Sequence, residues 1–125
     1  MKHIITVDPD HEKFTVTTEG EGSADGIIAF LKDIVGHPQW QPGNDILLDH
    51  RNLRLEKIKM DGIEKVSFFF KTIGGKLGNG RLALVMHRDI DFGIARTWEI
   101  LTADDVDIEI EVFRSIDAAQ AWLGK

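Results

Sequence analysis

Hydrophobic residues follow two different patterns in the stretches of this sequence that predict strands. Residues 14–18 and 108–112 alternate apolar with polar side chains, which is the two-residue period of a strand with one face in water. Residues 46–48 and 82–86 are continuously apolar, as in strands buried on both faces of a parallel sheet. A short apolar run at residues 3–8, ended by an Asp-Pro-Asp turn, predicts a first strand that forms a hairpin with residues 14–18.

Four further segments repeat apolar residues at spacings of three and four, the pattern of helices with one buried stripe. They cover residues 24–35, 61–73, 90–101 and 116–123. Ser23 and Ser115 are placed to cap the first and last helix, and Asp89 or Asp91 to cap the third. The glycine-rich stretch at 74–80 follows a helix and precedes a strand, so it predicts a helix stop and a turn instead of a phosphate-binding loop.

Strands and helices therefore follow one another in the order β, β, α, β, α, β, α, β, α. This order predicts a mostly parallel sheet with right-handed crossovers. We predict a single α/β domain over residues 1–125, with a mixed, mostly parallel five-stranded sheet and four helices. A chain of 125 residues is long enough to bury a core without disulfides or a structural metal.

Three pieces of the sequence carry a resemblance to a known superfamily. They are the strand ending in Leu-Leu-Asp-His-Arg at 47–51, the strand 81–85 with the Gly-Ile-Ala-Arg of 93–96, and the closing segment 112–123. Together with the opening hairpin and three βα units, they resemble the SpoIIAA-like branch of the STAS/SpoIIAA-like superfamily, named for sulphate transporters and anti-sigma-factor antagonists. The resemblance implies a βα superhelix, also seen in Sec14-type lipid-binding proteins, and a non-catalytic bacterial regulatory or protein-interaction module.

One position departs from the pattern of the anti-sigma-factor antagonists. Those proteins carry an Asp-Ser-Ser-Gly-like motif, with a phosphorylated serine, at the start of the helix after the third strand. Here the corresponding stretch, 59–63, reads Lys-Met-Asp-Gly-Ile and contains no hydroxyl group. The nearest serine, Ser67, lies more than a turn into the predicted helix. We therefore expect a module without the usual phosphoserine motif, in which Asp61 either mimics a fixed negative charge or, more simply, caps the helix.

Two charged triplets follow the two continuously apolar strands. Asp49-His50-Arg51 ends the first, and His87-Arg88-Asp89 ends the second. Ligands of open α/β sheets gather at the carboxyl ends of parallel strands, so we expect these side chains to lie at one edge. Trp40, in a proline-containing loop, is a candidate lid over this edge.

The triplets support two interpretations. In the first, Arg51 and Arg88 bind a small apolar or amphipathic anion, because a guanidinium fork matches a carboxylate or phosphate. The protein would then be a carrier or sensor. In the second, the charged residues pair with one another and keep the sheet edge soluble. An enzyme that uses His50 with Asp49 for proton transfer is a third, weaker hypothesis, because we find no catalytic motif.

Three aromatic or aliphatic residues fall outside the predicted buried stripes of their helices. Phe68 lies on the second helix, and Phe92 and Ile100 lie on the third. They predict either scattered exposed side chains or an apolar patch for a protein partner, with a homodimer as the first expectation.

Composition narrows the classes of partner. The formal net charge is −6 and there is no cysteine, so we expect no nucleic-acid partner and no disulfide, in keeping with a cytoplasmic protein. No apolar run is long enough for a membrane span. The histidines lack the spacing of a local metal site, so we predict no metal and no cofactor; they are His3, His11, His37, His50 and His87.

Overall fold

The strands of the sheet follow the hydrophobic pattern of the sequence. The structure is a computed structural model that describes residues 1–10 and 12–124, so His11 lies outside the described residues. The strands are β1 (Lys2–Val7), β2 (Lys13–Glu21), β3 (Asp45–Arg54), β4 (Arg81–Val85) and β5 (Glu109–Phe113). They lie side by side in the order β1-β2-β3-β4-β5. β1 and β2 form the antiparallel hairpin and the other neighbours are parallel, which confirms the predicted mixed sheet.

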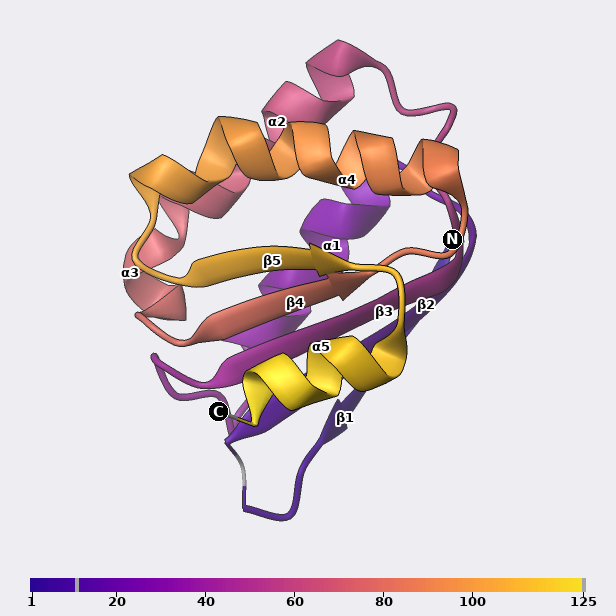
Figure 1. Cartoon of the computed structure of the whole chain (residues 1–125). Coiled ribbons are helices and arrows are strands. Elements are labelled where there is room, and N and C mark those ends of the chain that lie inside the picture. Colours follow the sequence, from indigo (N-terminus) through magenta and orange to yellow (C-terminus); the bar gives the residue numbers. More distant parts are fainter. Residues whose placement is uncertain (11, 125) are drawn as a thin grey trace.

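Helices cover the two faces of the sheet unequally. They are α1 (Ala24–Val35), α2 (Met60–Thr72), α3 (Gly74–Leu77), α4 (Asp89–Thr102) and α5 (Ile116–Leu123), with a 3₁₀ turn, η1 (Ala103–Asp105), after α4. α5 lies against β3 and β4 on one face, while α1 is seen behind the strands in Figure 1 and α2 and α4 above them. Because helices cover both faces of β3 and β4, these strands are apolar at successive positions.

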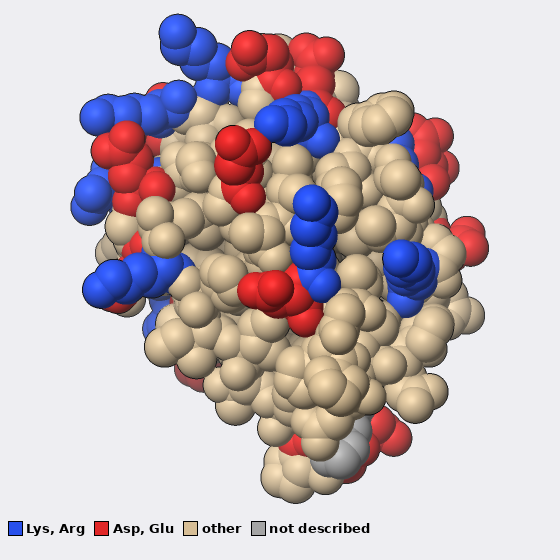
Figure 2. Space-filling model, turned by 180° about the vertical axis from the view of Figure 1, so that it is seen from behind, with Lys and Arg blue, Asp and Glu red and all other residues tan. Residues whose placement is uncertain are grey.

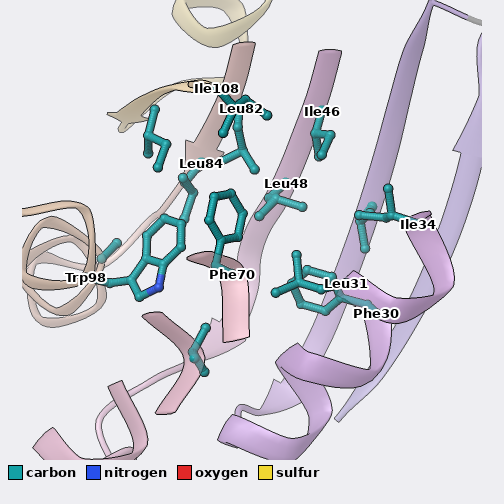
Figure 3. Close-up of a cluster of buried hydrophobic side chains, with 14 of the residues drawn as sticks. Phe30, Leu31, Ile34, Ile46, Leu48, Phe70, Leu82, Leu84, Trp98 and Ile108 are labelled. Carbon is teal, nitrogen blue, oxygen red and sulfur yellow. The ribbon is translucent and has the colours of Figure 1, made fainter. Parts of the chain in front are cut away.

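The main core lies between the sheet and α1, α2 and α4. Figure 3 shows side chains of β3 and β4 meeting those of the three helices; the labelled residues include Phe30, Leu31, Ile34, Ile46, Leu48, Phe70, Leu82, Leu84 and Trp98. A smaller cluster on the other face joins β3 and β4 to α5 through Leu47, Ala83, Val85, Ala119 and Leu123.

A bulge in β3 decides which of its residues face the main core. β2 and β3 pair in register up to Asp49, after which β3 carries one extra residue before Asn52. Leu48 and His50 face the main core, and Leu53 faces the same side beyond the bulge. Strict alternation would have put Leu53 on the opposite face, so the bulge lets β3 keep one core-facing side over its whole length.

Helix ends agree with the sequence at two positions and differ at others. Ser23 and Ser115 are N-caps, and each accepts a backbone N–H at 3.0 Å. The predictions for Asp89 and Asp91 are wrong: Arg88 is at the N-cap of α4 and no side chain caps it. The glycine-rich stretch is not only a turn, because its first four residues form α3. Asp61 is likewise inside α2, whose N-cap is Lys59.

Trp40 does not form a lid over the carboxyl ends of the strands. Its loop leads into the amino end of β3, where the indole Nε1 donates to the carbonyl oxygen of Lys76 at 2.9 Å. Its ring meets that of Phe14, at the start of β2, edge-on with centroids 5.1 Å apart. Trp40 is 9% exposed and serves the core at the opposite edge of the sheet.

Candidate functional site

The first charged triplet is divided between the two faces of the sheet. Successive residues of β3 alternate, so His50 turns into the main core while Asp49 and Arg51 lie on the face of α5. The guanidinium of Arg51 donates two hydrogen bonds to the Asp49 carboxylate, at 2.8 and 2.9 Å. These hydrogen bonds lower the pKa of Asp49. Arg51 is therefore already neutralised by its neighbour.

The second triplet, which follows β4, is engaged in separate contacts. Arg88 donates to the Asp91 carboxylate at 2.7 and 3.1 Å and forms an ion pair with Glu56. Asp89 forms an ion pair with Arg114, and His87 is exposed. Arg51 is held by Asp49 on the α5 face of the sheet, whereas Arg88 is held by Asp91 and Glu56 at the start of α4. The structure therefore does not bring the two guanidinium groups together around one ligand.

Asp91 joins three segments at this edge. Its carboxylate is 2% exposed and accepts the backbone N–H of Leu55 at 2.8 Å as well as the bonds from Arg88. Leu55 follows β3, so Asp91 fastens the β3–α2 connection to the first turn of α4. We call Asp91, Arg88 and the Leu55 N–H the Asp91 clamp.

Beside the clamp lies an apolar cavity with a volume of about 60 Å³, between the sheet and α1, α2 and α4. Strand residues such as Leu48 and Leu84 form its floor. Ile27, Ile58 and Ile94 line it and are partly exposed, so the cavity approaches the surface between them. Ile27 lies in the first turn of α1, Ile58 just before α2 and Ile94 in the second turn of α4, on the segments that follow the carboxyl ends of β2, β3 and β4.

A buried polar pair lies at the floor of this cavity. His50 is 2% exposed, and its Nδ1 is 2.6 Å from the hydroxyl oxygen of Thr18 on β2. That oxygen is also 3.3 Å from the carbonyl oxygen of Asp49, and the ring of Phe30 packs 5.6 Å from the imidazole. Burial lowers the pKa of His50 to about 4, so the imidazole is neutral at pH 7.

The wall of the cavity contains a hydrogen-bond donor without a partner. Trp98 on α4 is 9% exposed, and its indole Nε1 is buried and unbonded within the described residues. Phe70 packs edge-on against the indole, with centroids 5.0 Å apart, which fixes the ring. In Figure 3 the indole nitrogen lies on the ring edge opposite Leu84, away from the sheet.

Of the three residues proposed as one interface, Phe92 lies apart from Ile100. Phe68 and Ile100 are 74% and 72% exposed. Phe92 is partly buried at the other end of α4 from Ile100, with the guanidinium of Arg114 over its ring at 4.6 Å. Phe68 instead shares a shallow groove with Leu101, where Glu64, Lys65 and Lys71 also lie. Leu101, which the helical pattern placed inward, is 38% exposed.

Sequence reasoning missed Thr18, Asp91 and Trp98 as parts of the site. Thr18 carried a signal, because it shares the inward face of its strand with Phe14 and Val16 and is a polar group among apolar ones. Trp98 also carried one, because an indole on a buried stripe brings an N–H that needs a partner. Asp91 gave no such signal, since an acidic residue in a first helical turn is common.

The described residues contain no group of three or more potential metal ligands. Figure 2 shows basic side chains interspersed with acidic ones on the face seen there. None of the described helices has both the length and the apolar character needed to cross a membrane.

The hairpin, the three βα units and the closing helix define a SpoIIAA-like α/β domain, as the sequence predicted. The structure is similar to the crystal structure of an uncharacterized protein from the DUF3478 family, described as having a SpoIIAA-like fold, from Shewanella loihica PV-4. The match covers 98% of this chain and 92% of that chain, with a TM-score of 0.61 and 15% sequence identity. No protein-family model and no curated protein matches the chain. The similarity establishes the fold alone.

Proposed function

We propose that this protein is a non-catalytic binding module that holds a small apolar molecule in the cavity between the sheet and α1, α2 and α4. The observation that carries the proposal is an apolar cavity between the sheet and the helices that approaches the surface at the carboxyl ends of the parallel strands, where α/β proteins commonly bind ligands. The proposed site lies at the same edge of the sheet as the carrier or sensor site expected from the sequence. The ligand, however, lies in the cavity and not among the charged triplets.

Two features favour binding over catalysis. Among the cavity residues given by the described part of the chain, His50 is the one titratable side chain, and its low pKa leaves it neutral at pH 7. Asp49, the partner suggested by the sequence, is on the other face of the sheet and is occupied by Arg51. A phosphoserine switch is not part of the proposal, because Ser67 is 3% exposed and hydrogen-bonded to Thr102.

Filling the cavity is expected to abolish binding. The probe is methylenecyclopentane, a compact hydrocarbon, followed through the isoleucine methyl signals in NMR spectra. The cavity of about 60 Å³ is smaller than the apolar cavities of about 150 Å³ that admit benzene, so the probe can enter only when the partly exposed isoleucines at the cavity's outer side rotate away. Ala95→Val places two methyl groups in the cavity wall and should weaken binding at least about tenfold, since the space is lost.

Ala29→Val is the matched control for this experiment. It makes the same substitution at an exposed position of α1 and should bind the probe as the wild type does. The proposal fails if the wild type gives no saturable shift of the Ile27, Ile63 or Ile94 signals. It also fails if Ala95→Val, shown to be folded by circular dichroism, binds with wild-type affinity.

A second candidate function is protein–protein contact, for which a second copy of the chain is the first partner to test. Phe68 and Leu101 favour it, because large apolar side chains flanking a groove are typical of contact surfaces. The groove also carries both signs of charge, from Glu64 and from Lys65 and Lys71, so a twofold contact can place opposite charges together.

We expect Phe68→Asp to shift the wild type from dimer towards monomer in sedimentation equilibrium, because a charge would be buried in the contact. Ile4→Asp is the control, since Ile4 is 67% exposed on β1, far from α2 in the sheet order, and should leave the association unchanged. A wild type that stays monomeric at the highest soluble concentration would rule out self-association through this groove.

A further inference from the structure

We infer that the cavity selects neutral molecules that present one hydrogen-bond acceptor, such as a ketone, ester or ether oxygen, to the indole N–H of Trp98. The inference rests on the proposed function and specifies its ligand class. Its basis is the buried Nε1 of Trp98, which has no partner in the described residues although the ring lines the cavity.

The donor is fixed in place. Trp98 is held by the edge-on contact with Phe70 and by the packing of α4 against α2, so its N–H cannot easily turn to another acceptor. Trp40 shows the contrasting arrangement, because its Nε1 is satisfied by the carbonyl oxygen of Lys76. Buried polar groups are nearly always bonded, and an unpartnered one calls for an unseen partner. Because the nitrogen itself is buried, a ligand oxygen reaches it only when the side chains around the cavity move apart.

The charges around the cavity favour a neutral ligand over the anion expected from the sequence. Arg51 lies on the other face of the sheet, and Arg88 is bound by Asp91 and Glu56. His50, which does line the cavity, is kept neutral by burial. An anion would therefore lose its hydration without gaining a counter-charge, which is strongly unfavourable.

A matched pair of probes tests the inference. Cyclopentanone and methylenecyclopentane have nearly the same shape, but only the ketone has an acceptor oxygen. In ¹H–¹⁵N spectra the chain has three indole signals, and Trp98→Phe identifies the one from Trp98. We expect cyclopentanone to move the Trp98 indole proton downfield, and methylenecyclopentane to move it much less. The Trp40 signal, already bonded within the protein, is the internal control and should stay in place.

Affinities provide the second readout. Trp98→Phe should weaken cyclopentanone binding about tenfold, the effect of one lost hydrogen bond, and change methylenecyclopentane binding less than about twofold. If both probes bind the wild type and the Trp98 signal does not respond to the ketone, the inference is overturned while the proposed function stands. If neither probe binds, the proposed function itself fails. The wild-type spectra decide between these outcomes even if Trp98→Phe does not fold.

Discussion

Replacing Asp91 by alanine is expected to lower the free energy of unfolding by about 3 kcal/mol, because a buried N–H and an ion pair lose their partner together. Asp91 is 2% exposed and accepts the N–H of Leu55 at 2.8 Å. Leu55 is 4% exposed, so its N–H loses its acceptor in a buried setting. Urea unfolding at pH 7 measures the loss.

Two further variants separate the contributions of the clamp. Asp91→Asn keeps an acceptor oxygen for the Leu55 N–H but removes the charge that holds Arg88, so we expect an intermediate loss. Asp89→Ala is the control. The Asp89 side chain lies in the same turn but is 89% exposed, so its removal should leave the free energy of unfolding unchanged. An Asp91→Ala protein as stable as the wild type would show that the clamp does not hold the edge of the sheet.

The Asp91 clamp also holds part of the cavity wall in place. Leu55, the residue that Asp91 fastens, lines the cavity, and Ile58 follows it at the partly exposed side. In Asp91→Ala we therefore expect faster hydrogen exchange of the Leu55 N–H and of the first turn of α2, before the rest of the sheet. The measurement is native-state exchange at low denaturant concentration.

Acidification from pH 6.5 to pH 4 is expected to remove about 3 kcal/mol of stability through His50 alone. The pKa of His50 is about 4 in the folded protein, against an ordinary value of 6.5. Between these two pH values the unfolded chain binds a proton at His50 that the folded chain does not. Unfolding is therefore favoured as the pH falls, and the contribution is fully present only above pH 6.5. Urea unfolding at half-unit pH intervals measures the slope.

His50→Gln isolates this effect, because glutamine does not titrate. We expect the variant to be less stable at pH 7, since the contact with Thr18 and Phe30 is disturbed, but to lose much less stability down to pH 4. His87→Gln is the matched control, because His87 is exposed, and should keep the wild-type slope. Equal slopes in the wild type and His50→Gln would contradict the buried neutral imidazole.

Other titrating groups change the stability at lower pH than His50 does, or change it in the opposite direction. Hydrogen bonds from Arg51 and Arg88 lower the pKa values of Asp49 and Glu56, so the stability that these acids contribute is lost at lower pH. Burial raises the pKa of Glu99, which partly offsets the loss near the acidic end of the range. The comparison with His50→Gln removes both contributions.

The order of elements was accessible from the sequence because it depends on local regularities. Alternation at 14–18, unbroken apolar runs at 46–48 and 82–86, and four helical stripes specified the hairpin and the mixed parallel sheet. The four-residue helix α3 was not accessible in the same way, since a glycine-rich segment has no stripe of its own.

The candidate site was only partly accessible. The sequence indicated the edge of the sheet at which the proposed cavity approaches the surface and included His50, but it took His50, Asp49 and Arg51 as neighbours in one site. Alternation along β3 separates them, and the bulge after Asp49 then returns Leu53 to the core side. Trp40 was assigned to the wrong edge because the loop between a helix and the next parallel strand lies at the amino end of that strand, whichever way the indole turns.

The amino-acid sequence by itself determined the five strands, the four longer helices and their order, because these follow from periodicity between near neighbours. Only the tertiary structure decided which side chains share a space: Asp91 with Leu55, Thr18 with His50, and Trp98 with an apolar cavity. Such contacts join residues more than 30 positions apart, and they depend on register and packing, which no local pattern records.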